Sequence, residues 1–122
     1  MDFSLSAHGL PIYYLPGHGG RITNGLGQAL VARGYEVLGR ETVGDFKKLD
    51  FNDQVVTVAN DIKEHFWRDD AKIIANSFGG YLLLHALSKL TPYIGNDPGI
   101  LAPKVLFYIV GDRRDLIIEI KL

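Results

Sequence analysis

The sequence AKIIANSFGG, residues 71–80, and the ten residues after it decide the fold of this 122-residue chain. The stretch predicts a strand at Ala71–Ala75, a sharp turn at Asn76–Gly80 and a helix at Tyr81–Leu90. The helix is apolar nearly all round, which predicts that it lies against the middle of a sheet. A buried strand, a tight turn and a buried helix in this order are typical of an α/β protein.

The segments before this stretch also alternate between strand and helix. We expect a strand at Pro11–Leu15, a Gly-rich loop at Pro16–Gly20, a helix that starts after Thr23 or Asn24 and stops at Gly34, a strand at Tyr35–Leu38 and a surface connection from Gly39 to Leu49. The next helix begins at Asp50 or Asn52. Its apolar residues recur at steps of four and three, which predicts one buried stripe made of Phe51, Val55, Val58, Ile62 and Phe66.

The C-terminal third is expected to contain a loop and one strong strand. Thr91–Pro103 is punctuated by Pro and Gly and reads as mostly loop, with a short strand at Leu90–Ile94 as the alternative. Lys104–Val110 is apolar throughout, as strands buried on both faces of a parallel sheet are. We therefore expect a three-layer α/β sandwich with a mostly parallel sheet, in which the Lys104–Val110 strand lies at an edge that a partner chain of a homo-oligomer could cover.

Composition sets the class of protein. With 47% apolar residues and 22% charged residues, residues 1–122 are expected to form one domain. A net charge of -1 lacks the basic footprint of nucleic-acid binding. No apolar stretch approaches the roughly 18 residues that span a bilayer, so we expect no membrane association. The chain has no Cys, which excludes disulfides and thiolate metal sites and favours the cytoplasm.

Ser77 is the candidate nucleophile. It lies between a buried strand and a buried helix, and Gly79 and Gly80 would let the two elements approach closely. A strained turn of this kind presents a Ser hydroxyl above the sheet edge, and the start of the helix stabilises a negatively charged oxygen. The alternative is that Ser77 only caps the helix, as Ser often does.

The combination resembles the α/β-hydrolases in compact or truncated form, from Pro11 to about Ile118. Their elbow, usually Gly-x-Ser-x-Gly, is similar to Ala75-Asn76-Ser77-Phe78-Gly79, and Leu15–Gly20 looks like their loop beside the oxyanion site. The resemblance implies an enzyme that hydrolyses an ester or related acyl bond of a small-molecule substrate without a cofactor. It also implies that the backbone N–H groups of His18 and Phe78 form the oxyanion hole.

The same resemblance assigns the catalytic acid. Residues 108–118 are similar to the strand, Gly and acid that present the carboxylate in this family, and Asp115 is the residue chosen, with Asp112 as the alternative. A third interpretation is that both are solvated charges that pair with Arg113 and Arg114 in a surface turn.

The catalytic His that the family places after the acid is not found. All four His residues, at positions 8, 18, 65 and 85, precede Asp115. His85 lies eight residues after Ser77, about 12 Å along one helix, too far for a hydrogen bond. His18 alone has a route to the site, and it is a ligand for a substrate oxygen, a substitute base or a bystander in the Gly-rich loop. Because the catalytic His is missing, we expect weak or no turnover from these 122 residues.

Three other functions compete. The Gly17-x-Gly19 pattern suggests a nucleotide-binding loop, but Ile22 stands where the dinucleotide motif has its third Gly. A metal-dependent hydrolase would need paired His ligands, and the four His show no such spacing, so no metal is expected. A non-catalytic α/β-hydrolase-like interaction module is the main alternative, because the His is missing.

Overall fold

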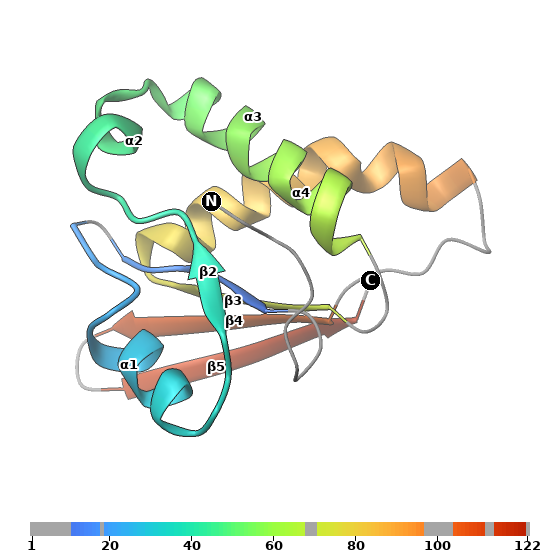
Figure 1. Ribbon diagram of the computed structural model, residues 1–122. Coiled ribbons are helices and arrows are strands. Elements are labelled where there is room, and N and C mark those ends of the chain that lie inside the picture. Colours follow the sequence, from blue (N-terminus) through green and yellow to red (C-terminus); the bar gives the residue numbers. More distant parts are fainter. Residues whose placement is uncertain (1–10, 18, 68–70, 97–103, 112–113, 122) are drawn as a thin grey trace.

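A computed structural model describes residues 11–17, 19–67, 71–96, 104–111 and 114–121, which form one five-stranded sheet. The strands are β1 (Ile12–Leu15), β2 (Val37–Gly39), β3 (Lys72–Asn76), β4 (Lys104–Gly111) and β5 (Arg114–Lys121). Their order across the sheet is β2-β1-β3-β4-β5 (Figure 1). The first four are parallel and β5 is antiparallel to β4, so the expected mostly parallel α/β sheet is confirmed.

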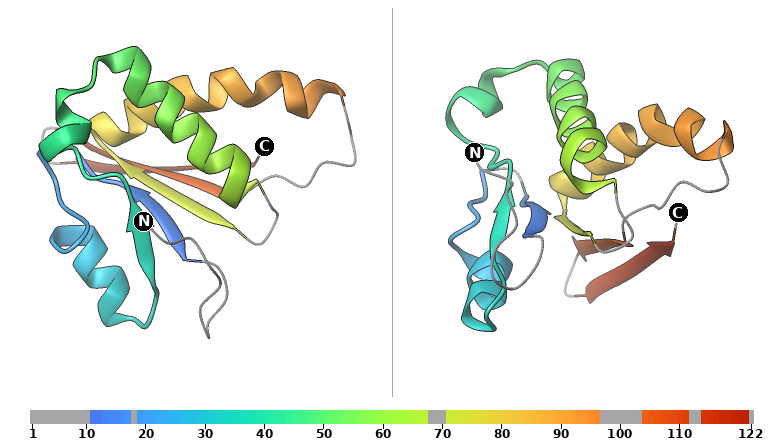
Figure 2. Two further views of the ribbon diagram at one scale, coloured as in Figure 1. Left: turned by 45° about the horizontal axis from the view of Figure 1, so that its top comes forward. Right: turned by 45° about the vertical axis from the view of Figure 1, so that its right-hand side comes forward.

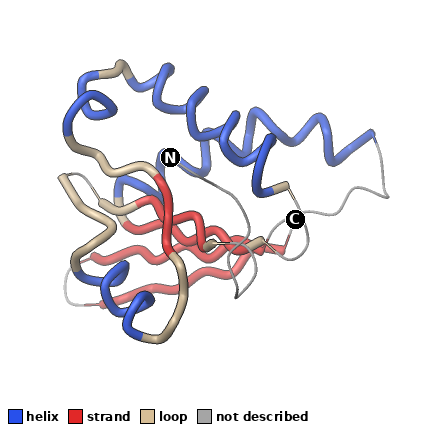
Figure 3. Tube along the Cα trace, in the orientation of Figure 1, coloured by secondary structure: helices blue, strands red, loops and turns tan. Residues whose placement is uncertain are grey.

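Helices cover both faces of the sheet. They are α1 (Gly25–Ala32), α2 (Gly44–Lys48), α3 (Phe51–Asp61), its π-helical continuation η1 (Ile62–Phe66) and α4 (Phe78–Asn96). In Figure 2, α1 lies on one side of the strands while α3 and α4 lie on the other. In Figure 3 the strands, in red, lie between the short helix α1 on one side and the longer helices on the other, and α1 covers only part of the sheet. No helix in the described part of the chain is long and apolar enough to cross a membrane.

Strand β1 shows how the sequence produces this layering. Its side chains alternate, so Tyr13 and Leu15 belong to the large core under α3 and α4, while Ile12 and Tyr14 belong to the smaller core under α1. All four are buried. A strand covered on both faces must be apolar at successive positions, which is why the run is continuous rather than alternating.

Helix α3 buries the predicted stripe. Val55 and Val58 in α3, and Ile62 and Phe66 in η1, are buried in the large core, and Phe51 packs against it from the helix start. The helix begins where Asp50 accepts a hydrogen bond at 2.8 Å from the backbone N–H of Asp53. The predicted capping residue and the predicted stripe are both confirmed.

Two expectations about helices were wrong. The surface connection before residue 50 contains the short helix α2, which follows the buried Thr42. Helix α4 extends to Asn96, so neither a loop from Thr91 nor a strand at Leu90–Ile94 is present there. Pro92 cannot donate a backbone hydrogen bond, and the helix continues past it with one such bond fewer.

Helix α4 is also less buried than its apolar sequence indicates. Leu82, Leu83, Ala86 and Leu87 are buried, whereas Tyr81 is 54% exposed and Leu84 is 50% exposed. The helix packs on the sheet from one side and on α3 from another, and the remaining face carries its surplus apolar residues outward.

Strand β4 is not the edge of the sheet, contrary to expectation. Strand β5 pairs with it along its whole length, from Lys104 opposite Lys121 to Gly111 opposite Arg114. Arg114 and Asp115 at the start of β5 suggested a loop. The β-branched residues that follow, and the alternation of apolar and charged residues from Ile118 to Lys121, fit a strand instead. Strand β5, and not β4, is therefore at this end of the sheet.

The strand order creates one switch point. The chain leaves β1 for β2 on one side and later returns to β3 on the other, so the crossover helices α1 and α3 lie on opposite faces. In sheets of this type, ligands bind outside the carboxyl ends of the two strands that flank such a point. Those ends are occupied here by the loop after β1 and by Ser77.

Candidate functional site

Ser77 lies directly between β3 and α4 with a left-handed backbone. Its φ is 52°, and it is the only non-Gly residue with positive φ among those described. Residues that cap helices normally have an extended backbone, so Ser77 differs from an ordinary cap. A strained residue at a strand-to-helix turn is the local geometry that the elbow motif requires. Ser77 itself is exposed.

Gly79 makes the close approach of α4 and β1 feasible. A Cβ atom at this position would collide with the carbonyl oxygen of Leu15 and would lie 2.7 Å from that of Pro16. The first turn of α4 therefore rests on the backbone at the end of β1. This contact fixes the direction in which Ser77 leaves the sheet, and it explains why the sequence has a Gly here.

We expect Ser77→Gly to be more stable than Ser77→Ala by about 1 kcal/mol. Both variants lose the hydroxyl, but only Ala retains a Cβ in the left-handed region. Urea unfolding at neutral pH measures the difference. Equal stabilities would show that the backbone of residue 77 is not strained.

The loop after β1 borders Ser77. A Cβ atom on Gly17 would lie 3.4 Å from Ser77 Cβ and 3.9 Å from Ser77 Oγ. The carbonyl oxygen of Gly17 accepts hydrogen bonds from Gly20 N at 2.8 Å and from Thr42 Oγ1 at 2.6 Å, which hold the loop in a tight turn. His18, the expected second oxyanion donor, lies outside the described residues.

A pocket of about 240 Å³ opens at the switch point, on the α1 face of the sheet. It is lined by residues from the ends of β1 and β3 and from the start of α1, namely Tyr14, Pro16, Gly17, Gly20, Arg21, Asn24, Gly25, Leu26 and Asn76. Burial raises the pKa of Tyr14, and a hydrogen bond with the side chain of Asn76 acts in the opposite direction. Asn76 precedes Ser77 in the chain, Gly17 lies beside it in space, and both line the pocket. The pocket therefore adjoins Ser77.

A groove of about 460 Å³ lies between the outer surfaces of α3 and α4. Its walls include aromatic rings in contact: Phe51 and Tyr81 are stacked with centroids 5.2 Å apart, and Tyr81 and His85 meet edge to face with centroids 4.6 Å apart. Phe51 also contacts Phe78, the residue after Ser77, at 6.3 Å between centroids. The aromatic rings therefore extend from Phe78 along α4, away from the pocket on the α1 face.

Asp115 is placed in strand β5 and not in a loop after β4. It is opposite Val110, two residues beyond Tyr108, which is level with Asn76 at the end of β3. Its backbone is therefore at the same edge of the sheet as Ser77 but two strands away, about 10 Å across. Asp112, the alternative acid, lies outside the described residues.

The described His residues are not next to Ser77. His85 is on α4, more than two turns along, where its ring meets Phe51 and Tyr81. His65 is in η1, and its Nε2 is 3.8 Å from Glu64 Oε2. His8 and His18 lie outside the described residues. Within the described part of the chain, Ser77 therefore has no imidazole positioned as its base.

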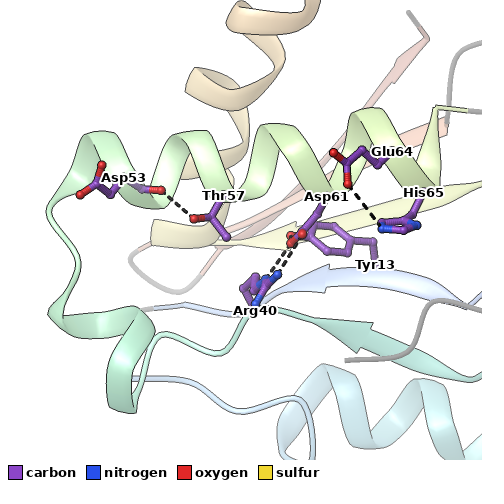
Figure 4. A network of polar contacts seen from close by, with 7 residues as sticks. All are labelled: Tyr13, Arg40, Asp53, Thr57, Asp61, Glu64 and His65. Carbon is purple, nitrogen blue, oxygen red and sulfur yellow. Dashed lines mark hydrogen bonds and ion pairs between the residues drawn. The ribbon is translucent and has the colours of Figure 1, made fainter.

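A buried polar network, which sequence reasoning missed, ties the sheet to α3 (Figure 4). Arg40, just after β2, binds Asp61 through two hydrogen bonds of 2.7 and 2.9 Å. The hydroxyl of Tyr13 donates to the same carboxylate at 2.7 Å. A sequence signal was present, because Gln54 and Asp61 are seven residues apart and share a helical face with Val58. The structure buries both polar side chains.

This network predicts a loss of stability in alkali. Burial and the Asp61 charge raise the pKa of Tyr13 well above 10.0, although Arg40 lowers it. In the unfolded chain the Tyr13 phenol ionises near its ordinary pKa of 10.0, whereas in the folded chain it stays neutral there. The free energy of unfolding is therefore at its full value below this pH and falls above it. Above this pH, the free energy of unfolding of the native chain should fall by up to about 1.4 kcal/mol per pH unit relative to that of Tyr13→Phe. Unfolding curves of the native chain and of Tyr13→Phe between pH 9 and 12 test this prediction. If the two free energies of unfolding fall in parallel, the prediction is wrong.

Family models, curated proteins and solved structures give no match. Among the described residues, no group of three or more His, Asp or Glu is arranged to hold a metal ion. The function proposed for this chain therefore rests on the geometry around Ser77.

Proposed function

We propose that this protein is a serine hydrolase of α/β-hydrolase type that acts on an ester or related acyl bond of a small molecule. The observation that carries the proposal is the left-handed Ser77 between β3 and α4, with Gly79 packed on the backbone of β1. Such a turn costs stability, and strained residues of this kind cluster at functional sites. The loop after β1 borders Ser77 and supports the same proposal.

In the proposed reaction, Ser77 Oγ attacks the acyl carbonyl carbon and its proton passes to a base. The carbonyl oxygen becomes an oxyanion, which the backbone N–H groups of Phe78 and His18 bind at the positive end of α4. Collapse of this intermediate expels the alcohol, which takes up the proton. Water then attacks the acyl-serine and releases the acid. Asp115 would orient the base.

The identity of the base determines the rate. His65 and His85 are out of reach of Ser77, so we propose that His18 acts as a substitute base and that turnover is slow. Added imidazole can take the place of a missing side-chain base. Its effect should be largest in His18→Ala.

Hydrolysis of p-nitrophenyl acetate, with and without imidazole, tests the proposal. We expect slow hydrolysis that Ser77→Ala abolishes, that Ser88→Ala on the same helix retains, and that imidazole raises about tenfold. Imidazole also hydrolyses the ester directly, so the rate with Ser77→Ala is subtracted. Equal rates for Ser77→Ala and the native chain would remove Ser77 as the nucleophile. Unchanged Ser77-dependent turnover in His18→Ala would remove the substitute base only.

A second candidate function is an interaction module, and strand β5 favours it. It forms one end of the strand order, and its eight residues offer a long row of backbone groups on the side away from β4. Edges of this kind pair readily with another chain. We propose a homo-oligomer in which β5 strands pair. Sedimentation should show dimers that increase with concentration, and a concentration-independent monomer would contradict it.

A further inference from the structure

Three aromatic side chains on the outer surfaces of α3 and α4 touch one another and still face solvent. The ring of His85 meets that of Phe51 edge to face with centroids 5.1 Å apart, and the ring of Tyr81 contacts both. Tyr81 and His85 are exposed, and Phe51 is only partly buried. Exposed apolar side chains that occur singly need no explanation, whereas a gathered group marks a binding surface.

The three rings line the groove of about 460 Å³ between α3 and α4. Tyr81, His85 and Ser88 recur at steps of four and three, so they form the wall along α4, and Phe51 and Val55 form the wall along α3. The volume is within the range of small-molecule sites, roughly 300–1,000 Å³. Aromatic rings bind one another by stacking or edge to face, so such walls suit a flat ligand. The groove therefore fits a small molecule with an aromatic part.

Lys89 sets the charge that this ligand should carry. It is the only Lys, Arg, Asp or Glu among the residues that line the groove, and it forms no ion pair within the described part of the chain. Lys89 is one turn beyond His85, about 6 Å along the helix axis, so its flexible side chain can reach the end of a molecule that lies on the rings. An ammonium group at that end attracts a carboxylate and repels a cation. Charge complementarity therefore favours an aromatic acid.

We infer that this groove binds small aromatic carboxylates, with the ring system against Tyr81 and His85 and the carboxylate paired with Lys89. An exposed ion pair of this kind corresponds to about fourfold in affinity, and the ring contacts supply the rest. Ser77 does not line the groove, and the pocket at the switch point lies on the other face of the sheet. The site is therefore separate from the proposed hydrolysis, and its test needs no turnover.

Naphthoate and naphthamide test this inference, because they share the same rings and differ in the charge of the polar group. Binding is measured by NMR titration of the native chain at neutral pH, with the signals of Tyr81 and His85 as reporters of the location. We expect both ligands to shift these signals and naphthoate to bind about fourfold more tightly. Lys89→Met removes the charge and keeps an apolar chain, so the two ligands should then bind about equally. Lys48→Met, on an exposed position of α2, is the matched control and should retain the preference.

Tyr81→Ala tests the aromatic wall. It should weaken the binding of both ligands about fivefold, because it removes a ring that each of them contacts, and it should leave their ratio unchanged. Tyr35→Ala, which replaces an exposed Tyr beside β2, is the control and should change neither affinity. All of the replaced side chains are exposed, so each variant should fold.

Equal binding of naphthoate and naphthamide to the native chain would overturn the inference, and so would a preference for naphthoate that survives in Lys89→Met. Signal changes at Tyr81 and His85 that follow the protein concentration and not the added ligand would show that a second copy of the chain covers the groove. That result would overturn the inference as well.

Discussion

Asp61→Ala is expected to lower the free energy of unfolding by about 3 kcal/mol. Asp61 is only 7% exposed and accepts hydrogen bonds from both Arg40 and Tyr13. Its removal leaves a guanidinium and a buried phenol without their acceptor, and unpaired buried groups cost more than the pair itself contributes. The Arg40 side chain is 32% exposed, so water relieves part of this cost and the lower end of the usual range applies.

Urea unfolding at pH 7 measures this effect, with Asn60→Ala as the matched control. Asn60 is the preceding residue on α3 and is exposed, so its replacement should change stability by less than about 0.5 kcal/mol. A loss below about 1 kcal/mol for Asp61→Ala would show that the network contributes little to stability. Replacing Asp61, Arg40 and Tyr13 together by Leu, Met and Phe should recover most of the loss.

Gly79→Ala is expected to destabilise the chain by about 3 kcal/mol, at the upper end of overpacking costs. The added methyl group meets the carbonyl oxygens of Leu15 and Pro16, which belong to the backbone of β1 and its loop. Backbone atoms of a central strand cannot rotate away as a flexible side chain can. The start of α4 must therefore move off the sheet, and Ser77 moves with it.

Gly17→Ala is the matched control on the facing loop. A Cβ there makes contacts of 3.4 Å or longer, which is ordinary packing, so stability should change by less than about 1 kcal/mol. Guanidinium unfolding of the two variants gives the comparison. Similar stabilities for Gly79→Ala and Gly17→Ala would show that α4 does not rest on β1 in the way described.

The sequence predicted those helices and strands whose own pattern of apolar residues determines which side is buried. The continuous apolar run of β1 and the stripe of α3 predicted a sheet with helices packed on it, and the Gly residues after Ser77 predicted the close turn. These features are local, because each depends on the spacing of neighbouring residues. Strand β5 was missed because its antiparallel pairing with β4 is a contact between strands, and the charged sequence around Asp115 resembled the acid-bearing segment of the family.

The polar contacts of the core and of the loop beside Ser77 could not be predicted because they join residues that are distant in the sequence. Asp61 meets Tyr13 across 48 positions of the sequence, and Thr42 bonds to Gly17 across 25. Tyr14 and Asn76 line one pocket although they lie on different strands, β1 and β3. The turn at Ser77 was predicted from local sequence, because the Gly residues that let strand and helix approach follow it directly.

Labelling with a fluorophosphonate probe tests the central claim, that Ser77 is a nucleophile held ready by the fold. Attack by Ser77 Oγ on phosphorus expels fluoride and leaves a stable adduct, which peptide mass spectrometry locates. We predict one adduct, at Ser77, in the folded chain, with none in Ser77→Ala or in the chain unfolded in urea. Equal labelling of Ser77→Ala, or no labelling of the folded native chain, would contradict the claim.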